Sequence, residues 1–323
     1  MAAFYPMKLS GVTKSPIWGG TRLIRDWSKP STCDTVGESW ELTVRKNEVC
    51  TIQNGAYSGA SLSDLIARFP SEIMGASTLS NGEFPLLVKL IDAADRLSVQ
   101  VHPDDDYATR VENDRGKTEM WYIVDADEDA EIICGLAEGY DNAAYQTALA
   151  RGELMSALRT QQVQAGETYF IPAGLPHAIG KGILIAEIQQ NCDLTYRVYD
   201  YDRRQADGSL RELHVQKAND VIRPFTKEEI DAIRYERATT PWDDTLLADC
   251  KYFRVEKKTL TCNTNRLDVC DYLRHLLCLE GEGVMLCDGT EYPFCRGDSI
   301  LLPACLSPIT LAGKATFLLS TAY

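Results

Sequence analysis

The stretch that decides the fold is GETYFIPAGLPHA, residues 166–178, because it has a second copy near the end of the chain. That second copy is GDSILLPACLSPI, residues 297–309, and it aligns with the first without a gap. Each copy has a glycine, an acid, a hydroxyl residue, three mostly apolar residues and Pro-Ala. Four residues after that alanine, the first copy has His177 and the second has Pro308. The chain therefore repeats one element but places a histidine in only one copy.

Short apolar runs separated by turn residues surround both copies. Such runs, with turn signals at regular spacing, predict an all-β sandwich or jelly roll. A second parallel lies upstream, where residues 120–135 and 275–289 each read as strand, turn and strand. The alternative is that similar turn chemistry arose independently in two unrelated places. We predict a mainly β protein in which a jelly roll occurs twice.

Two parts of the chain have apolar residues at helical spacing instead. Residues 140–160 predict two short helices, within a small helical insertion over about 137–162. Residues 209–235 predict a helical linker that is interrupted at Pro224 and Phe225. We therefore expect a first domain over residues 1–240 and a second domain over residues 241–323.

The composition restricts the classes of partner. The formal net charge of −14 without a basic stripe argues against binding to nucleic acid or to an anionic membrane. No apolar run reaches 18 residues, so we expect no membrane span. The eleven cysteines form no CxxC pair, and the first residues lack an apolar signal core, which together predict a cytoplasmic protein with free thiols. A small anionic substrate would need a local cluster of lysine or arginine.

Two of the four histidines have neighbours that suit a metal. Gln100 and His102 are two residues apart in strand-like sequence, so both side chains face the same side. Glu119 opens the next apolar run, and His177 lies in the repeated element. Two imidazoles and a carboxylate are a normal ligand set for catalytic zinc, and the amide oxygen of Gln100 can add a fourth ligand.

The alternative for each histidine is an ordinary core or surface position. We prefer that alternative for His214, which has the surroundings of a helix face, and for His275, which opens a strand in the second roll without visible partner ligands. For His102 and His177, the combination with Glu119 favours a metal site.

Four segments carry a resemblance to a known family: SPIWGGTRL (15–23), FPLLVKLIDAADRLSVQVHPDD (84–105), GKTEMWYI (116–123) and IPAGLPHAIGKGILIAEIQQNCDLTYRVYDYDR (171–203). The chain resembles the type I mannose-6-phosphate isomerases in their short bacterial form, from about residue 5 to its end. The resemblance implies two cupin rolls with a small helical insertion. Because the second copy of the repeated element has Pro308 where the first has His177, we expect the second roll to bind no metal. The resemblance also implies one Zn²⁺ per chain, bound by Gln100, His102, Glu119 and His177.

The resemblance further implies that the chain interconverts mannose 6-phosphate and fructose 6-phosphate, and it assigns roles in the catalytic pocket to Ser98, Lys117, Glu187, Asp193 and Arg197. Such a reaction moves a proton between C1 and C2 through an enediol or enediolate. We expect Glu187 and Lys117 to handle the proton, without deciding which acts as the base. Arg197 is the first candidate for binding phosphate, with Lys117 beside it; it can instead stabilise the enediolate.

Other expectations concern the pocket wall and the assembly. Trp18 is expected to line the sugar, and Lys89, a charge inside an apolar strand, is expected to pair with an acid. The alternatives are an isomerase of another phosphosugar, a non-catalytic sugar-phosphate-binding cupin, and an Fe²⁺ cupin oxygenase, although oxygenase sites commonly contain more histidine. We expect a small-molecule phosphosugar as the partner, and a monomer or weak homodimer.

Overall fold

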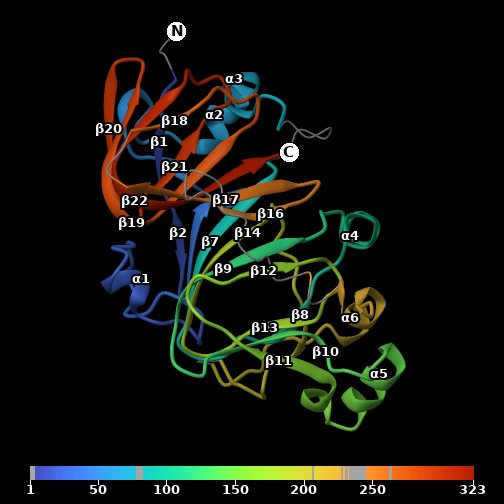
Figure 1. The fold of residues 1–323 in the computed structure, drawn as a ribbon. Coiled ribbons are helices and arrows are strands. Elements are labelled where there is room, and N and C mark those ends of the chain that lie inside the picture. The colour runs from blue at the N-terminus through green and yellow to red at the C-terminus, as the bar shows by residue number, and fades with distance from the viewer. Residues whose placement is uncertain are drawn as a thin grey trace.

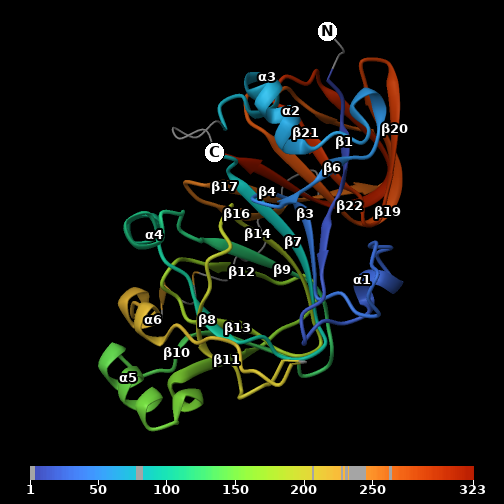
Figure 2. The same ribbon diagram turned by 180° about the vertical axis from the view of Figure 1, so that it is seen from behind.

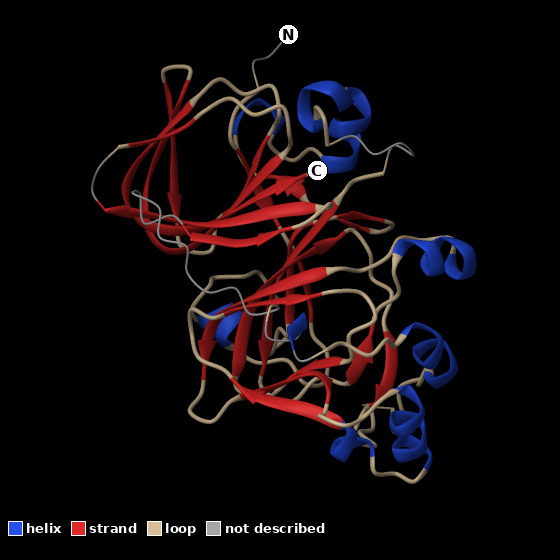
Figure 3. Ribbon diagram, turned by 45° about the vertical axis from the view of Figure 1, so that its right-hand side comes forward, coloured by secondary structure: helices blue, strands red, loops and turns tan. Residues whose placement is uncertain are grey.

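The computed structural model describes residues 4–77, 83–205, 207–226, 228–229, 232, 245–261 and 264–323. The chain folds into two β-rich lobes, and both chain ends lie on the lobe that contains β17 to β22 (Figure 1). The helices lie at the edges of these lobes rather than between sheets (Figure 3). The predicted mainly β architecture is confirmed.

The first lobe contains two antiparallel sheets. One sheet has the strand order β12-β9-β14-β7-β3-β2, with β2 (Val12–Lys14), β3 (Glu38–Leu42), β7 (Leu86–Ala93), β9 (Glu119–Ala126), β12 (Thr168–Ile171) and β14 (Ile183–Gln190). The other has the order β11-β10-β13-β8-β15, with β8 (Val99–Val101), β10 (Glu131–Leu136), β11 (Leu158–Gln162), β13 (His177–Ile179) and β15 (Tyr196–Tyr199).

The second lobe contains one hydrogen-bonded sheet in the order β16-β17-β22-β19-β21-β1-β6, with β18 paired to β22 and β20 to β19. Its strands are β1 (Met7–Ser10), β6 (Thr51–Ile52), β16 (Thr245–Asp249), β17 (Phe253–Thr261), β18 (Asn265–Leu267), β19 (Arg274–Cys287), β20 (Thr290–Cys295), β21 (Ser299–Leu302) and β22 (Ile309–Ala322). The N-terminal β1 therefore lies beside β21 (Figure 2). The boundary between domains at residues 240 and 241 lies outside the described residues and stays a prediction.

The remaining elements are short. They are α1 (Arg22–Arg25), the hairpin of β4 (Val44–Arg45) and β5 (Glu48–Val49), η1 (Gly55–Tyr57), α2 (Leu62–Arg68), α3 (Pro70–Met74), α4 (Asp105–Glu112), α5 (Asn142–Ala150), η2 (Leu154–Ala157) and α6 (Val215–Val221). The Asp104 and Asp141 carboxylates cap α4 and α5, accepting from the amides of Tyr107 and Ala144. Within the described part of the chain, no helix is long and apolar enough to cross a membrane.

The pairing of the strands confirms the internal repeat. In the first lobe, β9 pairs with β12 and β14, and β10 pairs with β11 and β13. In the second lobe, the long strand β19 makes the corresponding pairs with β21, β20 and β22. The hairpin β19–β20 turns tightly at Asp288 and Gly289, both with positive φ, whereas the connection from β10 to β11 contains α5 and η2. The insertion therefore interrupts one hairpin of the first roll.

Two helical predictions need correction. The predicted insertion ends in a strand, because residues 158–162 form β11 and pair with β10. Its second helix is the single 3-10 turn η2. The predicted linker over 209–235 is helical at α6, while residues 209–214 form no helix. Residues 227, 230–231 and 233–235 of that linker lie outside the described residues.

Strand β14 has the sequence ILIAEIQQ and is buried on both of its faces. Leu184, Ala186 and Ile188 belong to the apolar cluster shared with the second lobe. Ile183 and Ile185 belong to the core of the first roll. A strand covered on both sides needs apolar residues at successive positions, which explains the near-continuous run. Glu187, between Ala186 and Ile188, shares the face of Ile185, so its carboxylate points into the first roll.

Candidate functional site

A row of four side chains crosses the larger sheet of the first roll. Trp121 of β9 pairs directly with Glu187 of β14, Glu187 pairs with Lys89 of β7, and Lys89 pairs with Trp40 of β3. Residues in direct register on one face have their side chains next to one another. The pairing of four strands therefore places the acid Glu187 and the base Lys89 next to each other, between two tryptophans.

A second row crosses the smaller sheet. His177 of β13 pairs with Gln100 of β8, and Gln100 pairs with Arg197 of β15. The two sheets form the two walls of the first roll, and residues from both rows line one cavity of about 340 Å³. The repeated element that contains His177 thus places it beside the polar segment around residue 100.

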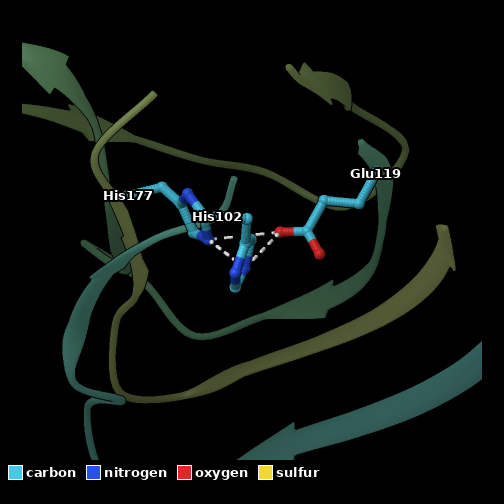
Figure 4. A group of neighbouring side chains, drawn as sticks. All are labelled: His102, Glu119 and His177. Atoms are coloured by element: carbon cyan, nitrogen blue, oxygen red, sulfur yellow. Dashed lines mark hydrogen bonds and ion pairs between the residues drawn. The ribbon is translucent and has the colours of Figure 1, made fainter. Parts of the chain in front are cut away.

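The proposed metal ligands meet beside Gln100 and Lys117, two residues that line this cavity. His102, Glu119 and His177 are buried, and their ligating atoms converge from three different segments (Figure 4). The two Nε2 atoms lie 3.1 Å apart, and Oε1 of Glu119 lies 3.5 Å from His102 Nε2 and 3.2 Å from His177 Nε2. Donors that each lie 2.0–2.1 Å from one tetrahedral zinc ion are about 3.3 Å apart. The spacing of these three atoms fits such an ion.

The hydrogen bonding of the rings also suits a metal. His177 Nδ1 donates to the carbonyl of Leu175 at 2.8 Å, which orients the ring with Nε2 toward the centre. Burial, followed by the charge of Lys117, lowers the pKa of His102 to about 3, which keeps the His102 imidazole neutral. Both Glu119 carboxylate oxygens are buried without a hydrogen-bond partner among the described residues. Buried nitrogen and oxygen atoms that converge on one point in this way fit the ligand set of a cation.

Gln100 extends the ligand group, because its Nε2 lies 3.4 Å from His177 Nε2. The nitrogen and oxygen of a glutamine amide exchange places when the amide turns by half a rotation. The turned amide directs its oxygen at the same point. The four residues that the sequence suggested as ligands are therefore adjacent.

Lys117 lies next to this group, and its Nζ is 3.7 Å from Oε2 of Glu119. Both side chains are buried. Burial by itself raises the pKa of the Glu119 carboxyl, but the charge of Lys117 and the interactions with His102 and His177 outweigh it and hold this pKa well below its usual range. Glu119 is therefore a carboxylate in the folded protein.

Glu187 and Lys89 form the buried pair that the sequence predicted for Lys89. Lys89 Nζ lies 3.1 Å from Glu187 Oε2, and Trp121 Nε1 donates to Glu187 Oε1 at 3.1 Å. Burial, followed by the charge of Glu119, raises the pKa of Glu187 to about 7, against the opposing effect of the two lysines. Burial alone would lower the pKa of Lys89, but Glu187 and Glu38 raise it above its usual value.

Arg197 lines the outer part of the cavity. Its Nε donates to Ser98 Oγ at 3.3 Å, and its Nη1 donates to the Glu212 carbonyl at 2.8 Å. Arg211 also lines the cavity and is engaged by both oxygens of Asp200. These contacts fix the Arg197 guanidinium at the cavity wall through neutral acceptors, and no carboxylate in the described part of the chain forms a direct ion pair with it.

The cavity collects the remaining residues suggested by the sequence. Trp18, Ser98 and Asp193 line it, and Asp193 is exposed at its mouth. The sequence analysis did not assign three further charged lining residues, Lys14, Glu38 and Arg211. Strand periodicity places Glu38 on the same face as Trp40, which is two residues away. The Glu38 carboxylate accepts a hydrogen bond from the Trp40 indole at 2.7 Å. Lys14 had no local signal; it reaches the site because β2 pairs with β3.

The second roll has no comparable group in the part of the chain that the structure describes. The only described histidine there, His275, is buried, and its Nε2 lies 2.8 Å from Ser299 Oγ. Ser299 Oγ in turn donates to the carbonyl of Glu41 on β3. In agreement with the sequence, this histidine has a structural environment.

Comparisons with known proteins place the chain in a family. Residues 7–158 match the family described as phosphomannose isomerase type I, catalytic domain, and residues 243–322 match the mannose-6-phosphate isomerase cupin domain. The chain is 40% identical to the mannose-6-phosphate isomerase ManA of Bacillus subtilis, over 98% of each chain. It is 36% identical to the mannose-6-phosphate isomerase of Streptococcus mutans, over 92% of each chain.

Solved structures agree. The mannose 6-phosphate isomerase of Bacillus subtilis superposes with a TM-score of 0.89 at 33% identity and covers 98% of this chain and 99% of its own. A phosphomannose isomerase variant from Salmonella typhimurium superposes with a TM-score of 0.80 at 16% identity, which supports the fold alone. Near-complete coverage by relatives at 36–40% identity, together with the two matching domains, shows that this chain is an isomerase of the type I phosphomannose isomerase family.

Proposed function

We propose that this chain interconverts mannose 6-phosphate and fructose 6-phosphate with one Zn²⁺ ion bound by Gln100, His102, Glu119 and His177. One observation carries the proposal: the group of His102, Glu119 and His177 lies next to Gln100 and Lys117, which line a cavity that contains more cations than acids, in a chain of net charge −14. The cations are Lys14, Lys89, Lys117, Arg197 and Arg211, and the acids are Glu38, Glu187 and Asp193. A phosphosugar needs such a local excess of positive charge.

The ligand chemistry supports zinc. Two neutral imidazoles and one carboxylate bind Zn²⁺ and leave a position for substrate or water. When bound, the ion supplies Lewis-acid stabilisation of negative charge that develops on the substrate oxygens. The amide of Gln100 completes the set without adding charge.

The proton transfer belongs to Glu187 and Lys117 in this proposal. An aldose–ketose isomerase removes a proton from the carbon next to the carbonyl and returns it to the neighbouring carbon. Glu187 lines the cavity, and its carboxylate is held by Trp121 at Oε1 and by Lys89 at Oε2. In this proposal the Glu187 carboxylate takes and returns the proton. Lys117 lines the same cavity from the strand that carries Glu119 and can move a proton to or from a substrate oxygen.

Substrate positioning is assigned to the outer part of the cavity. The guanidinium of Arg197 binds the phosphate, or stabilises the enediolate, through paired hydrogen bonds. Ser98 orients Arg197, and Asp193 at the mouth accepts from sugar hydroxyls. Lys117 assists with the phosphate, and the indole of Trp18 packs against the sugar ring. Each of these roles is a proposal for that residue.

The competing functions have less support. A non-catalytic sugar-binding cupin needs neither the buried Glu187–Lys89 pair nor the ligand group, and an Fe²⁺ oxygenase would leave the basic lining without a purpose. An isomerase of another phosphosugar would use the same residues, but the curated relatives cited above are named for mannose 6-phosphate.

The location, oligomeric state and partners of the protein are proposed from its composition and from its surface. Cysteines in the described part of the chain are unpaired, which suits a reducing cytoplasm. The exposed large apolar side chains, among them Ile17, Val111 and Val269, are scattered along the sequence rather than consecutive. We therefore propose a cytoplasmic monomer or weak homodimer that binds a small phosphosugar and binds neither nucleic acid nor membrane.

The test is a coupled assay that follows fructose 6-phosphate formed from mannose 6-phosphate. Purified protein is assayed before chelation, after chelation, and after zinc is restored. Loss of turnover with the chelator and its return with zinc are the expected results. A zinc-replete, folded protein without turnover would overturn the assignment for this substrate.

A further inference from the structure

We propose that Tyr252, a residue of the second roll, positions Lys117 in the first roll by holding the carboxylate of Asp105. Tyr252 is a positioning residue in this proposal, since it acts through Asp105 and is not among the residues that line the cavity. The proposal rests on the proposed function, because turnover is its main readout.

The contact between the rolls is a short hydrogen bond. Tyr252 lies in the turn between β16 and β17, and its hydroxyl donates to Asp105 Oδ2 at 2.6 Å. Burial and the nearby Asp105 raise the pKa of Tyr252 above its usual value, so its hydroxyl keeps the hydrogen that it donates. Asp105 is the first residue of α4, three residues after the ligand His102.

The same carboxylate holds the segment that contains Lys117. Asp105 Oδ1 accepts from the backbone amide of Gly116 at 2.9 Å and from Gln190 Nε2 at 2.9 Å. Gln190 Oε1 in turn accepts from the amide of Thr118 at 2.9 Å. The residues on both sides of Lys117 are therefore tied to Asp105, directly or through one glutamine.

The backbone leaves this segment little freedom. The amide of Lys117 donates to the carbonyl of Pro103 at 3.0 Å. A Cβ added at Gly116 would lie 2.5 Å from backbone atoms of Asp104 and Asp105, so the segment packs directly against the start of α4. The amides of Gly116 and Lys117 are thus held at the start of α4 and that of Thr118 by Gln190, and Lys117 leaves this anchored segment with its ammonium near Glu119.

The charge of Asp105 makes the arrangement dependent on Tyr252. Although burial raises the pKa of Asp105, the hydrogen bonds from Tyr252, Gly116 and Gln190 hold it below its usual range. A carboxylate that loses its strongest donor rotates to recover another one, and here such a rotation releases Gly116 or Gln190. Since displacement of a catalytic group by about 1 Å can cost on the order of a hundredfold in rate, a small shift of Lys117 is measurable.

The alternative is that Tyr252 only attaches one roll to the other. A double-mutant cycle on kcat separates the two, because residues that act in series give non-additive effects. The variants are Tyr252→Phe, Asp105→Asn and the double variant, each with full zinc content. The matched control is Tyr5→Phe, which likewise removes a hydrogen-bonded tyrosine hydroxyl in the second lobe. The Tyr5 hydroxyl donates to the carbonyl of Asn54 and accepts from the amide of Tyr57.

We expect Tyr252→Phe to lower kcat about five- to tenfold with KM changed less than about twofold, and Asp105→Asn to lower kcat further. The double variant should match Asp105→Asn alone. Tyr5→Phe should lower the melting temperature and keep the wild-type kcat. A wild-type kcat in Tyr252→Phe, or single effects that multiply in the double variant, would overturn the proposal.

Failure of the proposed function remains distinguishable, because it appears as a wild-type protein without turnover. In that case, amide hydrogen exchange at Gly116–Thr118 tests the positioning contact directly. Faster exchange there in Tyr252→Phe, with unchanged exchange in β21 and β22, supports the proposal. Unchanged exchange at Gly116–Thr118 contradicts it.

Discussion

The carboxylate of Glu187 lies 3.1 Å from the ammonium of Lys89, on residues that are directly opposite one another on β14 and β7. Their side chains are only 4% and 5% exposed, so each charge depends on the other. An ion pair that is buried to this degree is costly to break, because the remaining charge has neither water nor a partner.

The first prediction follows from that pair. Lys89→Met should lower the free energy of unfolding by about 3–5 kcal/mol, since it leaves Glu187 buried and unpaired. Adding Glu187→Gln to Lys89→Met should recover at least about half of the loss. Urea denaturation of the single and double variants measures both. A Lys89→Met protein as stable as the wild type would show that water reaches Glu187.

The second prediction concerns the metal. Glu119→Gln replaces the carboxylate among the ligands with a neutral amide, so the affinity for zinc should fall by more than about a hundredfold. Metal analysis after dialysis should give one zinc per chain in the wild type and almost none in the variant. His275→Gln, which changes a buried histidine away from the site, is the control and should retain its zinc. Equal zinc in both variants would refute the proposed ligand set.

The third prediction tests Arg197. Arg197→Lys keeps the charge but loses the planar guanidinium, so kcat/KM for mannose 6-phosphate should fall by about a hundredfold or more. Ser98→Ala removes only the acceptor for Nε and should cost about three- to tenfold. Steady-state kinetics of both variants decide the order. Equal kcat/KM values for Arg197→Lys and Ser98→Ala would show that the phosphate is not bound by the Arg197 guanidinium.

The fourth prediction concerns stability and pH. Burial, followed by the charge of Lys29, lowers the pKa of His275 to about 3, below the value near 6.5 of the unfolded chain. Below pH 6.5 the unfolded chain therefore binds a proton that the folded protein excludes, and stability falls as the pH falls toward 3. His275→Gln should reduce that slope by about 1.4 kcal/mol per pH unit. Denaturant titrations from pH 7.5 to 4.5 measure it, and parallel curves for both proteins would contradict the expectation.

The fifth prediction concerns a buried pair where the two lobes meet. Lys29 Nζ lies 2.7 Å from Glu41 Oε2 and 2.7 Å from the Gly297 carbonyl, so it joins β3 to the turn before β21. Lys29→Met should cost about 3–5 kcal/mol of unfolding free energy, because it leaves Glu41 buried without its cation. Arg266→Ala breaks an exposed pair with Asp268 and should cost less than about 1 kcal/mol. Similar losses in the two variants would contradict this account.

Local pattern was enough to predict much of the site. Alternation in the segment around residue 100 placed Gln100 and His102 on one face, and ligand chemistry joined them to Glu119 and His177. In the structure, side-chain atoms of Gln100 and His177, of His102 and His177, and of Glu119 and each histidine lie within 3.5 Å of each other. The unusual charge of Lys89 in an apolar strand predicted its pairing with an acid. These inferences worked because strand period and the cost of burying charge are properties of the local sequence.

The helical regions were predicted less well for the same reason. Residues 158–162 have no strand signal of their own and become β11 by pairing with β10. Local periodicity assigned them to the insertion, because the partner that makes them a strand is far away in the sequence.

The sequence by itself therefore determined the repeated roll, the candidate ligand group of its first copy and several polar residues of the pocket, since period, residue chemistry and the cost of buried charge act locally. Only the tertiary structure decided which of these residues became neighbours: the row from Trp121 to Trp40, the addition of β1 to the second sheet, and the hydrogen bond from Tyr252 to Asp105, 147 residues away. Strand pairing and lobe packing create such contacts. They join residues whose separation along the chain no sequence period encodes.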